Sequence, residues 1–134
     1  MGRKKRFEVL LVTGRRSHRW TIPKGWPMVG KSLAEAAAQE AFEEAGVRGT
    51  IDPVPVGSFD HIKQNLPSGE LLEVRILVHP LSVDRELPKW PEIGQRRRKW
   101  FSVEEAAKKV DSEELRALIV ISAERAMAGH RKQA

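Results

Sequence analysis

The sequence predicts one α/β domain, in which short strands alternate with helices. Residues 71–79 alternate apolar and polar side chains, a pattern typical of a strand with one buried face. Ser32, followed three residues later by Glu35, forms a capping box that marks the start of a helix. The chain has 134 residues, of which 40% are hydrophobic, and this is enough for a single core. We therefore expect one domain over residues 1–134, with a short basic tail at its N-terminus.

Strands are expected on both sides of this helix. Residues 7–13 form an apolar-rich run, and residues 20–22 form a shorter one. Residues 50–59 predict a further strand that two prolines interrupt. The clearest strand covers residues 71–79, and its buried face is expected to consist of Leu72, Val74, Ile76 and Val78.

The C-terminal part predicts a loop, a strand and two helices. Residues 84–95 contain two prolines and a glycine, so we expect a long loop there, close to the functional site. Residues 99–101 predict the last strand, after which Ser102 begins a short helix. Either Asp111 or Ser112 caps the final helix. The apolar stripe of the final helix is expected to comprise Leu115, Leu118, Ile119 and Ala126.

The most informative segment is the helix between Ser32 and Gly46, a glycine that suits the left-handed end of a helix. At about 100° per residue, Glu40, Glu43 and Glu44 lie within a fan of roughly 100° on one side of it. Without a counter-ion these carboxylates repel one another and take up protons. Mg²⁺ resolves that conflict, because it binds a few carboxylate oxygens, keeps several waters and completes its shell with substrate phosphates.

The alternative is that the glutamates form an ordinary solvated face, because Glu is a strong helix former. The alanines of the helix argue against that reading. Ala36 and Ala37 flank the carboxylates, which leaves Glu35 and Gln39 for the solvent side. A stripe of small residues for close packing consists of Ala34, Ala38, Ala41 and Ala45. We therefore expect the helix to lie between a core and a polar site.

The loop before the helix, residues 22–27, is suited to close contact with a ligand. Its two prolines fix the φ angle, and Gly25 lets the backbone approach a bound group. The carbonyl of Gly25 is therefore a candidate metal ligand.

At these residues the chain resembles the Nudix hydrolases, whose signature is G-x5-E-x7-R-E-U-x-E-E-x-G-U, with U aliphatic. Counted from Gly25, seven of the nine specified positions agree or nearly agree at the right spacing. The resemblance implies that Glu40, Glu43 and Glu44 are metal ligands and catalytic residues, with the Gly25 carbonyl beside them. It also implies a Nudix-type α/β/α sandwich, with a mixed β-sheet between helices, over roughly residues 6–126.

Two positions depart from the signature. Lys31 stands where the family has its first glutamate, and Gln39 stands where it has an arginine that usually orients a carboxylate. Lys31 is either a surface lysine near Glu35 or a contact for substrate phosphate. Gln39 can hydrogen-bond a neighbouring carboxylate but brings no charge. These departures keep a second hypothesis open, a non-catalytic Nudix-fold sensor that binds its ligand without turnover.

Within the family, the chain resembles the diphosphoinositol polyphosphate phosphohydrolases and diadenosine polyphosphate hydrolases. The segments that carry this likeness are residues 15–20, 23–25 and 57–59, together with Trp90 and residues 98–106. The likeness implies hydrolysis of a phosphoanhydride bond in a small polyphosphorylated molecule, with Mg²⁺ or, as a substitute, Mn²⁺. Guanidinium groups bind phosphate bidentately and lysines bind it as point charges. The candidate substrate-binding residues are Arg15, Arg16, Arg19, Lys24 and Lys31.

The formal net charge of +6 points to an anionic partner. The basic ends of the chain, residues 3–6 and 130–132, suit solubility or loose attraction to any polyanion. The internal clusters at residues 15–19 and 96–99 border the metal loop or a strand, so we expect phosphate there. An RNA-binding protein or an RNA 5′-pyrophosphohydrolase is the alternative, but the sequence has no recognition motif and no regular basic and aromatic stripe.

Composition also bears on location. The chain has no cysteine, which excludes disulfides and thiolate metal sites and fits a reducing cytoplasm. No apolar run approaches the ~20 residues of a membrane span, and residues 1–6 lead into a strand pattern and not into a signal-peptide core. We expect a cytoplasmic protein without membrane contact, either a monomer or a homodimer.

The general base stays open on the sequence. It is one of Glu40, Glu43 and Glu44, or it comes from a later loop, where Glu92 is the candidate and a plain exposed residue is the alternative. Trp26 and Trp90 lie in loops and are the candidates for stacking on a nucleobase. His18, His61 and His79 are candidates for metal coordination or proton transfer, although none has a paired ligand spacing. Lys63 is either a phosphate contact or a solvated residue.

Overall fold

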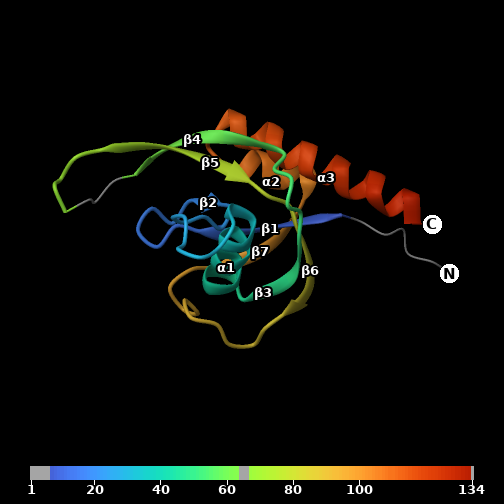
Figure 1. Ribbon diagram of the computed structural model, residues 1–134, viewed down its shortest axis with the longest axis horizontal. Coiled ribbons are helices and arrows are strands. Elements are labelled where there is room, and N and C mark those ends of the chain that lie inside the picture. The colour runs from blue at the N-terminus through green and yellow to red at the C-terminus, as the bar shows by residue number, and fades with distance from the viewer. Residues whose placement is uncertain (1–6, 64–66, 134) are drawn as a thin grey trace.

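The computed structural model describes residues 7–63 and 67–133, which form helices and strands packed in layers (Figure 1). The strands are β1 (Glu8–Thr13), β2 (Trp20–Thr21), β3 (Val47–Ile51), β4 (Gly57–Lys63), β5 (Leu72–Val78), β6 (Leu81–Glu86) and β7 (Arg98–Ser102). The helices are α1 (Leu33–Ala45), α2 (Val103–Lys109) and α3 (Glu113–Gln133). The predicted basic tail at residues 3–6 and the side chains of Lys63 and residues 130–132 lie outside the described part.

The strands pair in three sheets, and every pairing between them in the described residues is antiparallel. β1 lies between β2 and β7, β3 pairs with β6, and β4 pairs with β5. Figure 1 shows the β4–β5 hairpin projecting from one side of the molecule, while α1 lies on the opposite side of β1 from α3. The predicted α/β sandwich is therefore present, but the single mixed β-sheet is wrong: the described strands form three antiparallel sheets.

Two neighbouring residues of β1 show why the chain forms this sandwich. Leu11 and Val12 are both fully buried, and successive side chains of a strand point to opposite faces. Leu11 belongs to the core that includes Ile119 of α3, whereas Val12 packs with Ala41 and Ala45 of α1. The small-residue stripe predicted on α1 thus brings the helix close to the strand.

The strand predicted over residues 50–59 is wrong in its bounds. The structure has two strands there, β3 and β4, because Pro53 and Pro55 between them have no backbone N–H for a ladder. The long loop predicted over residues 84–95 also begins too early. Its first residues belong to β6, whose Leu81 and Val83 pack against the α1 core and whose backbone pairs with β3.

The predicted burial of two apolar stripes holds only in part. In β5, Val74, Ile76 and Val78 are half-buried, but Leu72 is 40% exposed, because the hairpin extends beyond the core. In α3, Leu115, Leu118 and Ile119 are buried as predicted, whereas Ala126 is exposed.

Among the residues that the structure describes, none of the helices has the length and hydropathy of a membrane span.

The helix ends confirm the capping predictions. The Ser32 hydroxyl accepts a hydrogen bond from the Glu35 N–H at 3.0 Å, and the Ser32 N–H donates to the Glu35 carboxylate at 2.8 Å. Gly46 ends α1 with a φ of 67°, in the left-handed region that favours glycine. Before α3, the Ser112 hydroxyl accepts from the N–H of Leu115 at 3.1 Å, so Ser112 is the cap.

Candidate active site

The acidic face of α1 is partly enclosed by two loops. Glu44 is only 3% exposed and Glu40, one turn earlier, is half-buried. The loop of residues 22–27 covers Glu40, and the loop between β6 and β7 covers Glu44. The predicted carboxylates therefore do not form a solvated helix face.

Gly25 contacts the acidic face directly. A Cβ built on Gly25 would overlap the carboxylate of Glu40, so any side chain at this point of the loop requires that carboxylate to move. The sequence predicts a close backbone approach at Gly25, and the group that it approaches is the Glu40 side chain.

Burial and crowding change how these carboxylates ionise. Burial and then a hydrogen bond with Glu40 raise the pKa of Glu44 to about 8. Burial also raises the pKa of Glu40, whereas its hydrogen bond with Glu44 lowers it. These directions indicate that the Glu40–Glu44 pair keeps a proton at a higher pH than an exposed carboxyl group does.

Arg96, from the loop before β7, is the cation of this cluster. Its Nη1 lies 3.6 Å from Oε1 of Glu44, and its Nε donates to Oε1 of Glu92 at 2.8 Å. Glu92 is therefore a largely buried partner in an ion pair, which excludes the alternative of a plain exposed loop residue. The N–H of Glu92 also donates to the Glu43 carbonyl at 3.0 Å, which fastens the loop to α1.

Gln39 holds the third glutamate of the cluster. Its side-chain amide donates to Oε2 of Glu43 at 2.8 Å, so the neutral residue in the arginine position of the signature does orient a carboxylate. Gln39 is half-buried and not on the solvent side as predicted, because this bond turns it towards the acidic face.

The donor set fits a hard divalent cation. In the part of the chain that the structure describes, no three His, Cys, Asp or Glu side chains already stand together as metal ligands. However, the carboxylates of Glu40, Glu44 and Glu92 influence one another electrostatically, and Arg96 is the cation that acts on both Glu40 and Glu44. Carboxylate oxygens in excess of their cation are the ligands that Mg²⁺ prefers.

The predicted substrate-binding residues do not gather in one place. Lys24 is half-buried and lines a cavity together with Gly25 and Glu40. Arg15 is exposed and reaches Gln95 of the β6–β7 loop at 3.4 Å. Arg19 pairs instead with Asp111, before α3, at 3.0 Å.

The remaining two residues of that set are exposed. Arg16 lies in the turn after β1. Lys31 lies beside Glu35, whose pKa is lowered first by the backbone N–H of Ser32 and also by the charge of Lys31. This position agrees with the surface-lysine alternative.

The basic cluster at residues 96–99 does not present four charges to one anion. Arg98 donates to the carbonyls of Ala45 at 2.7 Å and Leu87 at 3.3 Å, and it stacks on Trp90 at 4.0 Å. Arg96 also points inward, and the side chains of Arg97 and Lys99 lie over the rings of Trp20 and Phe101.

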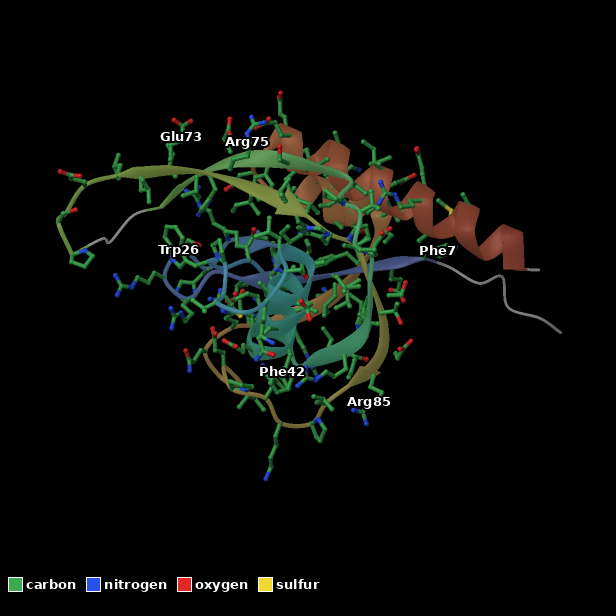
Figure 2. The ribbon with its side chains drawn as sticks, viewed as in Figure 1. Phe7, Trp26, Phe42, Glu73, Arg75 and Arg85 are labelled. Carbon is green, nitrogen blue, oxygen red and sulfur yellow. The ribbon has the colours of Figure 1, made fainter. Side chains whose placement is uncertain are left out.

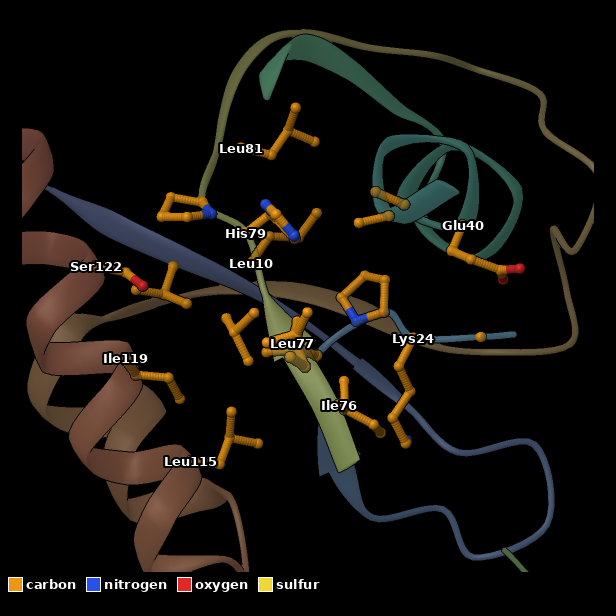
Figure 3. A pocket seen from close by; sticks show the side chains of 18 of the residues that line it. Leu10, Lys24, Glu40, Ile76, Leu77, His79, Leu81, Leu115, Ile119 and Ser122 are labelled. Atoms are coloured by element: carbon orange, nitrogen blue, oxygen red, sulfur yellow. The ribbon is translucent and has the colours of Figure 1, made fainter. Parts of the chain in front are cut away.

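A cavity of about 620 Å³ adjoins the acidic face (Figure 3). Glu40 and Lys24 line one side of it, Ile119 and Ser122 of α3 line the other side, and β5 runs between them in Figure 3. Its remaining walls are mostly apolar residues of β1, β5 and α3. The arrangement places an apolar space next to carboxylates and a lysine.

The two candidate stacking tryptophans differ in their surroundings. Trp90 packs on Gly46, and its ring carries the Arg98 guanidinium, so it belongs to the structure around the end of α1. Trp26 lines the cavity and is 48% exposed, and Figure 2 shows it near the outer edge of the molecule, on the side of the hairpin. Trp26 therefore lies where a ligand in the cavity would meet it.

The histidines have different settings. His18 has a φ of 58° in an exposed turn. His61 lines the cavity. His79 also lines it, and its Nδ1 lies 2.9 Å from the carbonyl oxygen of Asp52.

The comparisons with known proteins agree with this fold. Residues 1–119 match the NUDIX domain, and the chain belongs to this family. Nudix hydrolase 18, mitochondrial, of Arabidopsis thaliana is 36% identical over 100 residues, which are 75% of this chain and 54% of that protein. Diphosphoinositol polyphosphate phosphohydrolase 3-beta of Bos taurus is 36% identical over 105 residues, which are 75% of this chain and 58% of that protein.

A solved structure shows the same fold over most of the chain. The binary complex of the C. elegans Ap4A hydrolase superposes with a TM-score of 0.60 at 25% identity and covers 92% of this chain and 88% of that one. The predicted family and fold class are thus confirmed, and the predicted enzyme class is the one that these relatives carry. The chain spans little more than half the length of the Arabidopsis and bovine relatives.

Sequence reasoning missed the inward role of Arg96 and Arg98. A signal for it exists only if the period of two of a strand is extended back to residue 96, ahead of β7. In the run 96–99, Arg96 and Arg98 are partly buried while Arg97 and Lys99 are exposed. The cluster reads as one basic patch only if this alternation is ignored.

Proposed function

We propose that the chain is a Mg²⁺-dependent hydrolase of a phosphoanhydride bond in a small polyphosphorylated molecule, with Mn²⁺ as a substitute metal. The observation that carries the proposal is the pair of buried Glu44 and half-buried Glu40, with Gly25 against the Glu40 carboxylate. Two acids that share a proton form a site for a cation, because the cation displaces the proton and neutralises both carboxylates.

The residues of α1 divide the chemistry between them. Glu40, Glu43 and Glu44 would hold the metal, with the Gly25 carbonyl beside them. When bound, Mg²⁺ neutralises charge on the phosphates and on the leaving group. Lys24, on the cavity wall beside Glu40, binds phosphate as a point charge, and a carboxylate of the cluster takes the proton of the attacking water.

Two substrate classes are proposed, and the structure gives each a reason. A dinucleoside polyphosphate fits the apolar cavity, with Trp26 at its edge to stack on a base. A diphosphoinositol polyphosphate fits the exposed Arg15 and Arg16, which are neighbours in the turn after β1. We favour the dinucleoside polyphosphate, because an apolar cavity does not suit a highly phosphorylated inositol ring.

A substrate panel with Mg²⁺, with products identified by mass, tests the proposal. The expected result is cleavage of one of the two classes that stops in EDTA and in the Glu44→Gln variant. Binding of either class without cleavage would support the sensor hypothesis instead. Rapid removal of pyrophosphate from RNA 5′ ends, with neither class cleaved, would replace the substrate assignment.

The wider context of the chain is proposed with the function. We take residues 1–134 as one catalytic domain that acts as a monomer or homodimer. The cytoplasmic location stays a prediction, and several Arabidopsis relatives are mitochondrial proteins. Cell fractionation and analytical ultracentrifugation test location and oligomeric state.

A further inference from the structure

The helix α1 lacks a cation of its own for its most buried acid. Gln39 is neutral, and its amide is committed to Glu43 at 2.8 Å. Glu44, at 3% exposure, has no basic partner on the helix among the described contacts. When Glu44 is ionised, as metal binding requires, a buried carboxylate without a partner is strongly destabilising, so another part of the chain has to supply one.

Arg96 supplies it from a different element. Its side chain is 12% exposed and lies 3.6 Å from Glu44. The guanidinium is fixed from two further sides, by Glu92 at 2.8 Å and by the carbonyl of Thr13 at 3.2 Å. Thr13 itself is buried at the end of β1, where its hydroxyl accepts from the N–H of Arg97 at 2.9 Å. The guanidinium of Arg96 is therefore held in place by β1 and by the loop before β7.

We propose that Arg96 is a positioning residue that aims the Glu44 carboxylate at the metal, in place of the arginine that the signature lacks at Gln39. This role rests on the proposed function. Arg96 does not touch the substrate or the reacting atoms, and it acts through Glu44. A guanidinium is suited to it, because its rigid fork binds two carboxylates and a carbonyl at once, which an amine cannot do in the same geometry.

The chain offers a matched control in Arg125. Arg125 has partners of the same kinds, a carboxylate of Asp52 at 3.0 Å and a backbone carbonyl of Val54 at 2.7 Å. These partners lie between β3 and β4 and include no residue of the acidic face. If Arg96 only stabilises the fold, replacing either arginine should lower Tm and leave the Mn²⁺ spectrum unchanged.

The experiment compares Arg96→Gln, Arg96→Lys and Arg125→Gln. The first readout is the electron paramagnetic resonance spectrum of bound Mn²⁺ without substrate, and the second is the split between kcat and KM. We expect both Arg96 variants to change the Mn²⁺ spectrum and to lower kcat about 10-fold or more with KM nearly unchanged, the range typical of residues that orient metal ligands. Arg125→Gln should lower Tm but keep the wild-type spectrum and kcat. Arg96→Lys keeps the positive charge and so covers the case in which Arg96→Gln does not fold.

Two outcomes overturn different parts of the account. The positioning role is wrong if the wild-type protein binds Mn²⁺ and a folded Arg96 variant keeps the wild-type spectrum. It is also wrong if that variant keeps a kcat within about twofold of wild type, which corresponds to roughly 0.4 kcal/mol. If the wild-type protein binds no Mn²⁺ at millimolar concentration, the proposed function fails and the role of Arg96 fails with it.

Discussion

Two arginine forks lie in different regions of the molecule and show how a functional site differs from a structural contact. Arg125 faces one carboxylate, Asp52, and both side chains are about one-third exposed. Arg96 faces Glu44 and Glu92, both largely buried, with Glu40 close by. Around Arg125 one positive charge meets one carboxylate, whereas around Arg96 the carboxylates outnumber the single positive charge. The unbalanced region is the one that needs a further cation.

The carboxyl groups of the two regions respond in opposite directions. The N–H of Val54 and then the Arg125 guanidinium hold the pKa of Asp52 below its usual value. Burial raises the pKa of Glu44 to about 8, even though Arg96 opposes that rise. Asp52 therefore contributes stability as an anion, whereas Glu44 is most stable as an acid until a metal binds.

Loss of a carboxylate from the unbalanced region should have the largest effect. Glu44→Gln is expected to lower Mg²⁺-dependent hydrolysis by roughly 100-fold, because the ligand loses its charge and with it several kcal/mol of electrostatic stabilisation. The amide keeps the shape of the side chain, so circular dichroism should show the fold intact. Asp52→Asn is the control and should keep full activity. Normal hydrolysis and metal dependence in Glu44→Gln would remove α1 from the active site.

A methyl group added at Gly25 should lower activity nearly as much as the loss of a carboxylate. Gly25→Ala places a Cβ in the volume of the Glu40 carboxylate, which has to move. We expect at least a 10-fold loss of kcat/KM, in the range that displaced metal-site residues show. Gly129→Ala, on α3 with no atom within 4 Å of the new Cβ, should be neutral or slightly stabilising. Equal activity in the two variants would contradict the contact between Gly25 and Glu40.

The acidic region should also give metal-free protein an unusual pH dependence. The pKa of Glu44 is raised in the folded state from 4.5 to about 8, so the folded protein binds a proton more tightly than the unfolded chain. The contribution of Glu44 to stability therefore falls as the pH rises from about 4.5 to 8. Urea unfolding in EDTA across this range, for wild type and Glu44→Gln, isolates that contribution. A difference between the two proteins that does not change with pH would show that Glu44 does not titrate in this way.

The smallest effects are expected at the lysines on either side of the loop. Lys24→Ala should raise KM for a polyphosphate several-fold, because Lys24 lines the cavity beside Glu40. Lys31→Ala should change KM by less than about twofold, or roughly 0.4 kcal/mol, since Lys31 is exposed and its charge acts on Glu35. Steady-state kinetics at low ionic strength separates the two. A larger effect at Lys31 than at Lys24 would reverse this assignment.

The parts that the sequence predicts correctly depend on local chemistry. The capping box at Ser32, the left-handed Gly46 and the fan of glutamates follow from spacing along one helix, and so does the bond from Gln39 to Glu43. The parts it misses depend on contacts between distant segments. Arg96 meets Glu44 across more than 50 positions of sequence, and β6 becomes a strand through its pairing with β3. The scattering of Arg15, Arg19 and the 96–99 cluster has the same cause, because neighbours in sequence find different partners in space.

The central claim is that the excess of carboxylates on α1 is a metal centre. Its most direct test is a crystal structure of the protein soaked in Mn²⁺, with the metal located by anomalous scattering. We expect the strongest anomalous peak to lie within coordination distance of carboxylate oxygens of both Glu40 and Glu44, with the guanidinium of Arg96 still against Glu44. A fully soaked crystal with no peak on this face of α1, or with its strongest peak bound elsewhere, would contradict the account.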